Sequence, residues 1–327
     1  MYFLMTNDVE SFSIPLNKLD VDTAKEVYEV GLPRLLDLYA RHDIKCTFYF
    51  TGTMCELVPG SIDLVKAHGH EIGCHSYSHA ENKALDVLSY EEQLNEIKKA
   101  KKLIESIAGE IESFRAPALR LNGDTVKALE ATGFSSDSSI CSQRFDGPFT
   151  FGSKRKLKWL YAPRKPYFLS YDSTIKKGNS KVLEIPVSAL LFPFSGTVMR
   201  RSALITKILQ KYLFFEAKQN DKPVVFLFHP NECLEFKGKA IPTRRSTNFF
   251  EHLFSDVIRQ KLKLKNLGME SLKLLDEVLR SASEYGFEFV TANEYTRMYK
   301  DIYKGQIIKA IKTGDFKTFG TSKNSKI

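Results

Sequence analysis

The chain has 327 residues, of which 43% are hydrophobic, and its formal net charge is +9 at pH 7. A chain of this length can bury one large core, and no apolar run approaches the roughly 20 residues that a membrane-spanning helix needs. The composition therefore excludes a membrane-spanning protein and predicts one domain, residues 1–300, followed by a basic C-terminal tail, residues 301–327.

The cysteines are odd in number and lack the spacing of a metal finger, which favours reduced thiols. The run at residues 1–6 is apolar, but it is too short for a secretion signal and has no basic flank. We expect a cytoplasmic protein, with peripheral contact at the inner membrane face left open. The cysteines are Cys46, Cys55, Cys74, Cys141 and Cys233.

Residues 2–6 predict a buried strand, which leads into Asn7-Asp8-Val9-Glu10. If the extended geometry continues, Asp8 and Glu10 project to one side and Val9 to the other, because side chains alternate along a strand. Two carboxylates would then share a site. The alternative is a turn at the strand end with two solvated acids.

The following segments alternate between helix and strand. Apolar spacing predicts a helix over residues 23–42, a buried strand over 46–51, a short helix over 57–68 and a strand over 71–74. This order is typical of parallel α/β proteins, in which sites gather at the carboxyl ends of the strands.

His75 and His79 come directly after the strand at 71–74. If this stretch turns helically, two imidazoles four residues apart lie on one face, so both can reach one divalent cation. The alternative is a pair of core or surface histidines that bind nothing.

Ser89 and Glu92 have the spacing of a capping box and predict a helix that runs to about residue 107. Arg115 and Asp137 each follow a further predicted strand edge, and a helix over residues 123–132 separates them. Both polar side chains are therefore expected at the same end of the sheet as the histidines.

Residues 141–178 are predicted to form an irregular basic insertion. Residues 151–181 hold nine basic side chains against one aspartate, and the tail carries six lysines against two aspartates. Such segments suit an anionic lipid or a diphosphate-linked substrate at the insertion, whereas nucleic acid is an unlikely partner. Merely solvated basic loops are the alternative for each segment.

Order resumes with a strand over residues 182–186 and a helix over about 202–219. Residues 223–228 give the clearest buried strand of the chain, which ends in His229-Pro230-Asn231-Glu232. An amphipathic helix over 270–285 and a closing strand over 287–291 complete the pattern.

Five short motifs occur in one order, each at a predicted strand end. They are Thr6-Asn7-Asp8-Val9-Glu10, His75-x-x-x-His79, Arg115-x-Pro117, Asp137 and Leu227-Phe228-His229-Pro230. Over roughly residues 1–140 and 182–295, this set resembles the polysaccharide deacetylases of the NodB-homology type, carbohydrate esterase family 4. The resemblance implies an α/β fold, a distorted (β/α)7 barrel, that holds one divalent metal ion and hydrolyses N-acetyl groups of a saccharide. Two imidazoles and one carboxylate as ligands favour zinc as that ion.

Carried over residue by residue, the resemblance makes Asp8 the catalytic base and makes His75 and His79 metal ligands. Arg115 matches the arginine that pairs with the base, and His229 matches the general acid. Amide hydrolysis needs an activated nucleophile, a polarised carbonyl and a proton for the leaving nitrogen, which such a set can supply.

Four further residues complete the expected site. Asp137 matches the acid that favours the charged form of the catalytic histidine. Leu227 would line the pocket for the acetyl methyl group, and the backbone N–H near Ala118 would stabilise the oxyanion. Tyr77, between the two histidines, is expected to contact the substrate.

The sequence departs from the commonest family pattern in three places. Val9 stands where the ligand aspartate usually follows the base, so Glu10 must replace it, as in an Asp-Val-Glu variant of the family. Residues 118–120 differ from the usual aromatic and glycine, which affects the sugar-contacting surface. The chain shows no export signal, so the expected substrate is a cytosolic, nucleotide-linked or lipid-linked sugar.

Other functions remain open at this level. The same fold can open cyclic imides or ureides, for which a small closed pocket would be the sign. A non-catalytic carbohydrate-binding barrel would be expected to have lost Asp8 or His229, and both are present. Binding of an anionic membrane or a nucleic acid through residues 151–181 could coexist with catalysis.

Overall fold

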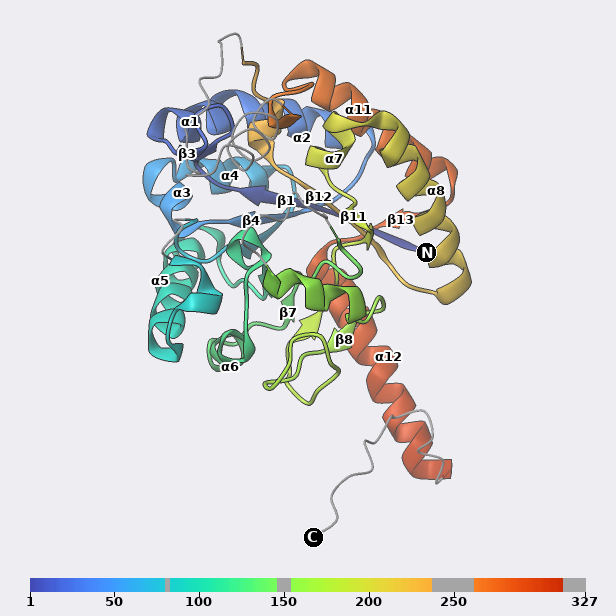
Figure 1. Cartoon of the computed structure of the whole chain (residues 1–327). Helices are drawn as coiled ribbons and strands as arrows, with labels where there is room; N and C mark the ends of the chain where they lie inside the picture. Colours follow the sequence, from blue (N-terminus) through green and yellow to red (C-terminus); the bar gives the residue numbers. More distant parts are fainter. Residues whose placement is uncertain (80–82, 146–153, 237–261, 314–327) are drawn as a thin grey trace.

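A computed structural model describes residues 1–79, 83–145, 154–236 and 262–313 of the chain (Figure 1). Its centre is a nine-stranded sheet in the order β12-β1-β4-β5-β6-β7-β9-β8, with β13 also paired to β1. Neighbours pair in parallel, except that β8 runs antiparallel to β9. The strands are β1 (Tyr2–Val9), β4 (Thr47–Phe50), β5 (Glu71–Cys74), β6 (Ser113–Phe114), β7 (Ser136–Asp137), β8 (Tyr167–Phe168), β9 (Leu183–Glu184), β12 (Val224–Phe228) and β13 (Glu288–Phe289).

The sheet curls, and the segment after β9 connects back to the opposite edge strand, β12. The chain leaves β9 and forms a hairpin of β10 (Ala189–Leu190) and β11 (Phe192–Pro193). On either side of this hairpin it bonds to β12: the Ser188 N–H donates to the Val225 carbonyl over 3.1 Å, and the Leu227 N–H donates to the Phe194 carbonyl over 3.2 Å. A seam of isolated hydrogen bonds thus closes the parallel strands into the expected distorted barrel.

Helices surround the barrel, and their apolar faces pack on the strands (Figure 1). The helix α2 is one example, because Leu32, Leu35 and Leu38 all lie on its buried side. The helices are α1 (Val21–Glu26), α2 (Leu32–Arg41), α3 (Gly52–Leu57), α4 (Gly60–Ala67), α5 (Tyr90–Ala108), α6 (Gly123–Ala131), α7 (Gly196–Arg201), α8 (Ala203–Asn220), α11 (Met269–Glu284) and α12 (Ala292–Thr313). A small antiparallel pair is formed by β2 (Phe12–Ser13) and β3 (Lys18–Leu19). Short 3-10 turns are η3 (Leu85–Val87), η4 (Pro117–Leu119), η6 (Lys154–Tyr161) and η7 (Pro230–Cys233).

The expected helix over residues 23–42 contains a π-helical turn, η1 (Val27–Gly31), between α1 and α2. This turn packs on η7, the turn that follows β12. A Cβ atom at Gly31 would lie only 2.7 Å from the carbonyl oxygen of Pro230, so the contact requires a residue without a side chain. The wider turn therefore brings a glycine against the segment that follows His229.

The predicted capping box is confirmed. The Ser89 side chain accepts from the Glu92 N–H, and the Glu92 carboxylate accepts from the Ser89 N–H over 2.8 Å. The basic insertion contains the turn η6 and the short strand β8. The helix α12 begins before residue 300 and continues into the segment predicted as a tail.

All five cysteines are buried free thiols, in keeping with the odd count in the sequence. Within residues 1–79, 83–145, 154–236 and 262–313, no helix is both long and apolar enough to cross a bilayer. The side chains of Lys154 and Lys156, on which the insertion hypothesis partly depends, lie outside the described residues.

Candidate active site

The polar residues singled out in the sequence follow the carboxyl ends of neighbouring strands. Asp8 is the second-last residue of β1 and Glu10 directly follows the strand, whereas His75 follows β5. Arg115 follows β6 and His229 follows β12. Because β1 pairs with β12 on one side and with β4 on the other, the parallel sheet brings these five side chains to one end of the barrel.

Glu10, His75 and His79 each offer a ligand atom, and these atoms lie within 4.8 Å of one another. The distance between Glu10 Oε2 and His79 Nε2 is 3.4 Å. Glu10 Oε2 is also buried and has no hydrogen-bond partner within the described residues. A buried carboxylate oxygen without a donor is costly, and a divalent cation would satisfy it. The donor set therefore fits a metal ion with two imidazoles and one carboxylate.

His75 is held in a ligand-ready orientation. Its Nδ1 lies 2.7 Å from the Arg115 carbonyl oxygen, and because a carbonyl only accepts, Nδ1 carries the proton. The other ring nitrogen, Nε2, then presents its lone pair to the cluster. Burial lowers the pKa of His75 more than the nearby carboxylates of Asp8 and Glu10 raise it, so the imidazole is neutral.

The expectation that residues 75–79 turn helically is wrong. The segment is an irregular loop, and Ser76 adopts a left-handed backbone conformation with φ 58°. This reversal directly after the strand brings the two imidazoles to a centroid separation of 5.9 Å. The four-residue spacing thus predicted the proximity of His75 and His79 but not the backbone that produces it.

Asp8 and Arg115 form a buried ion pair. Arg115 Nη1 donates to Asp8 Oδ1 over 2.9 Å, and the guanidinium also donates to Thr6 Oγ1 and to the Ser138 carbonyl. Burial raises the pKa of Asp8, but the positive charge of Arg115, with contributions from nearby imidazoles, outweighs burial and lowers it. Asp8 is therefore ionised and its position is fixed.

His229 is oriented by a residue that the sequence reasoning missed. Its Nδ1 lies 3.0 Å from Glu232 Oε1, and its Nε2 lies 3.9 Å from Asp8 Oδ2. Burial alone would lower the pKa of His229, but the hydrogen bond to Glu232 and the charges of Glu10, Glu232 and Asp8 raise it to about 9. The imidazole is therefore protonated at neutral pH.

Glu232 is in turn paired with Arg200, and both side chains are about 1% exposed. Arg200 also donates to the carbonyls of Lys263 and Lys265 over 2.7 and 2.8 Å. The placement of Glu232 three residues after His229 in a Pro-containing turn was a signal that could have been used. Nothing local in the sequence marks Arg200, which comes from α7.

Asp137 lies at the expected strand edge, where its partners are Ser139 and Glu184. Asp137 is the last residue of β7. Its carboxylate accepts a hydrogen bond from the Ser139 hydroxyl and faces the buried carboxyl group of Glu184. Burial raises the pKa of Asp137 to about 6 and that of Glu184 well above its ordinary value, so the two carboxyl groups share a proton. The predicted contact of Asp137 with His229 is made by Glu232.

A cavity of about 560 Å³ opens over these groups. Its lining includes Asp8, His79 and His229, together with the predicted substrate contacts Leu227 and Ala118. The Ala118 N–H donates to His79 Nε2 over 3.1 Å. The same nitrogen lone pair is one that a cation could take, which would release this N–H for a substrate oxygen.

Tyr77 is not part of this cavity lining. Its hydroxyl donates to Glu56 Oε2 over 2.8 Å, and the Lys99 ammonium lies 3.5 Å from its ring centroid.

The remaining walls of the cavity combine cationic with apolar side chains. They are formed by Arg144, Arg201, Lys263, Leu119, Val187, Phe192, Pro193, Ser195, Thr197, Val198, Ser202, Ile205 and Leu262.

Residues 20–136 match the family model described as polysaccharide deacetylase. A peptidoglycan deacetylase from Helicobacter pylori is 30% identical over 118 residues, which are 36% of this chain and 39% of that protein. A peptidoglycan-N-acetylglucosamine deacetylase from Bacillus cereus is 31% identical over 112 residues, 33% of this chain and 38% of that protein. The matches thus span about two fifths of each relative. The family segment contains His75, His79 and Arg115, whereas Asp8, Glu10 and His229 lie outside it.

Among solved structures, the polysaccharide deacetylase Bc1974 from Bacillus cereus aligns with a TM-score of 0.43 at 16% identity, covering 89% of this chain and 91% of that chain. A CE4 family pseudoenzyme from Bacillus anthracis aligns with a TM-score of 0.47 at 13% identity, covering 90% and 65%.

Proposed function

We propose that this chain, whose residues 20–136 match the polysaccharide deacetylase family, is a zinc-dependent hydrolase that removes N-acetyl groups from a saccharide. One observation carries the proposal. The ionised Asp8 and the protonated His229 line a single cavity together with His79, which belongs to the cluster of possible metal ligands formed with Glu10 and His75. Each of the three requirements of amide hydrolysis therefore has a candidate group within reach of one bound acyl group.

Glu10, His75 and His79 would hold the cation, in an Asp-Val-Glu variant of the family's ligand pattern. Two imidazoles and one carboxylate are a ligand mix that zinc accepts in catalytic sites with an open position. When bound, such an ion acts as a Lewis acid and makes water a stronger acid.

Asp8 is the base in this proposal. Its Oδ1 is occupied by Arg115, and its Oδ2 faces both His75 Nε2 at 3.8 Å and His229 Nε2 at 3.9 Å. The free oxygen therefore points toward the centre of the site, where it can accept a proton from water. Arg115 keeps the carboxylate ionised and prevents it from rotating.

His229 is the acid. Glu232 holds its Nδ1, so the protonated Nε2 faces the cavity and can donate to the leaving nitrogen. The Ala118 N–H would stabilise the negative charge on the acyl oxygen once His79 no longer accepts from it. Leu227, which is 8% exposed, contributes an apolar wall suited to an acetyl methyl group.

The proposal is tested by measuring metal content and amine release on the same preparation. We expect about one zinc per chain and release of free amine from at least one member of a panel of N-acetylated saccharides, free and diphosphate-linked. Saccharide binding without amine release would instead support a non-catalytic barrel. Turnover of cyclic imides or ureides alone would support the other rival reaction.

The alkaline limb of the pH profile should follow the pKa of His229. That pKa is raised to about 9, so the proton donor is present below this pH and is lost above it. A cation bound to Glu10 would cancel the contribution of that carboxylate to the raised pKa of His229. The alkaline limb is therefore expected at about pH 9 or below. In Glu232→Gln the imidazolium loses its charged partner, and we expect the limb of kcat/KM to move down by roughly one pH unit or more.

Glu56→Gln is the matched control, since Glu56 bonds the hydroxyl of Tyr77 outside the cavity lining. Its profile should superimpose on that of the unmodified protein. An unchanged alkaline limb in Glu232→Gln would mean that a group other than His229 sets it.

A further inference from the structure

The helix α8 exposes an apolar stripe on its outer face. Leu204 is 70% exposed, Ile208 57%, Tyr212 39% and Phe215 57%. Their spacing of four, four and three residues places them along one side of the helix. Four large apolar side chains in a row are unusual on a surface that meets only water.

The opposite side of α8 already belongs to the core. Leu209, Leu213 and Phe214 are buried there, and the ring of Phe214 packs edge-on against that of Phe194. The helix is thus apolar on two sides, which is typical of a helix that is covered on both. Within the described residues, only one of these sides is covered.

The charges on the exposed positions of α8 are all positive. Lys207, Lys211 and Lys218 are exposed and lie beside the apolar stripe, at a spacing of four and seven residues. The acid of this helix, Glu216, lies between Arg164 and Lys222 and is neutralised by them. The outer face therefore combines an apolar stripe with three cations and no exposed acid.

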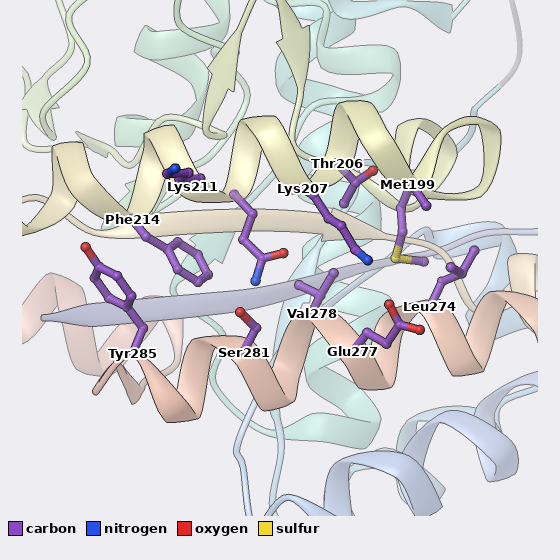
Figure 2. A pocket seen from close by; sticks show the side chains of 12 residues that line it. Met199, Thr206, Lys207, Lys211, Phe214, Leu274, Glu277, Val278, Ser281 and Tyr285 are labelled. Carbon is purple, nitrogen blue, oxygen red and sulfur yellow. The ribbon is translucent and has the colours of Figure 1, made fainter.

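Two of the three lysines border the side of α8 that is nearer α11. Lys207 and Lys211 line a cleft of about 370 Å³ between the two helices, together with Glu277 of α11 and Tyr285 directly after it (Figure 2). This arrangement leaves the apolar stripe on the side away from α11. The lysines and the exposed apolar side chains therefore form two adjacent, separate stripes along α8.

The first turn of α8 also forms part of the active-site cavity. Ser202 and Ile205 line it, as does Phe192 of the neighbouring hairpin, which is 38% exposed. Leu191, at the hairpin tip, is 51% exposed, and the hairpin strand β10 packs against the same helix. Whatever covers the outer face of α8 would therefore lie beside the cavity.

We propose that α8 docks on an anionic membrane surface. An apolar stripe flanked by lysines is the pattern by which a helix lies in a bilayer interface, with its apolar side chains among the acyl chains and its ammonium groups among the headgroups. A second copy of the chain is disfavoured as the occupant, because a two-fold contact through α8 would bring the same lysines near one another. The net charge of +9 favours the same partner.

Docking also narrows the substrate class, a step that rests on the proposed deacetylase function. The cavity beside α8 is lined by Arg144, Arg201 and Lys263, whereas Asp8 is the acid in its lining and is held by Arg115. Such a cavity suits a saccharide carried by a phosphate group. The substrate class would be a glycan linked through phosphate to a lipid and presented at the membrane surface.

Flotation with lipid vesicles tests the docking. We expect the full chain to float with vesicles of phosphatidylglycerol and phosphatidylcholine and not with phosphatidylcholine alone, and to detach as salt rises. In the triple variant Leu204→Ser, Ile208→Ser and Phe215→Ser, partitioning should fall at least about tenfold. Ile302→Ser, at a residue 62% exposed on α12, is the matched control and should float normally.

Activity on a short water-soluble N-acetyl saccharide separates this proposal from the deacetylase function. None of the three replaced side chains lines the cavity, so the triple variant should retain that activity while losing the vesicles. Equal flotation of the triple variant and the unmodified chain would overturn the docking proposal. So would a dimer that the triple variant converts to a monomer, because the stripe would then be a protein interface.

Discussion

The Asp8→Asn variant is expected to keep its metal and to lose turnover by at least about 10²–10⁴-fold, the usual contribution of a positioned general base. Asparagine preserves the size of the side chain but cannot accept a proton. It also leaves the Arg115 guanidinium buried without its carboxylate partner, so the melting temperature should fall as well. Metal content by atomic emission, with kcat and circular dichroism on the same sample, measures all three effects.

The Glu10→Gln variant should behave in the opposite way. The amide removes the anionic ligand from the set of Glu10, His75 and His79, so the metal content should fall and turnover should return at high added zinc. Asp276→Asn is a control for both variants, since Asp276 also contacts a histidine, His42, and neither residue lines the cavity. If Asp8→Asn lost the metal and Glu10→Gln kept it, the assignments of ligand and base would have to be exchanged.

The His229→Ala variant should distinguish amides from esters. Without a proton donor the leaving amine cannot depart, so hydrolysis of an acetamide should fall by roughly 10²–10⁴-fold. An activated acetate ester releases a phenoxide that needs little protonation, and its hydrolysis should fall far less. Initial rates on an N-acetylated saccharide and on a nitrophenyl acetate, measured with one preparation, give the ratio.

The metal content of His229→Ala should remain unchanged, because His229 lies outside the ligand set. His68→Ala, which removes an exposed histidine bonded to the Leu64 carbonyl, should alter neither rate. Equal losses on the amide and the ester would show that His229 does not act as the acid. Loss of the metal would show that it is a ligand.

The sequence was sufficient to predict the fold class and which residues share one end of the barrel. Alternation along β1 places Asp8 and Glu10 on one side, and the parallel order of strands carries His75 and Arg115 to the same edge. The alternation of side chains along a strand is a local property. The common direction of the strands follows from the α/β pattern of the sequence. The capping box at Ser89 is local in the same sense.

The rest depended on contacts between distant segments. Arg200 meets Glu232 only because α7 packs against β12, and no spacing in the sequence marks that encounter. Asp137 was assigned to His229 by resemblance, but its position on β7 places it against Glu184 of the adjacent strand. The loop after β5 could not be foreseen either, because the left-handed conformation of Ser76 is one that a serine rarely adopts.

The π-helical turn at Val27–Gly31 sets which side of the following helix, α2, faces the turn after β12. Such a turn holds one residue more than an α-helical turn, and if the same residues formed a regular α-helix instead, everything beyond the turn would be rotated by about 100°. A side chain would then replace Gly31 against the Pro230 carbonyl, where a Cβ atom would lie within 2.7 Å. Pro230 adjoins His229, so the extra residue, with no part in the chemistry, acts as a spacer that sets where the proton donor stands.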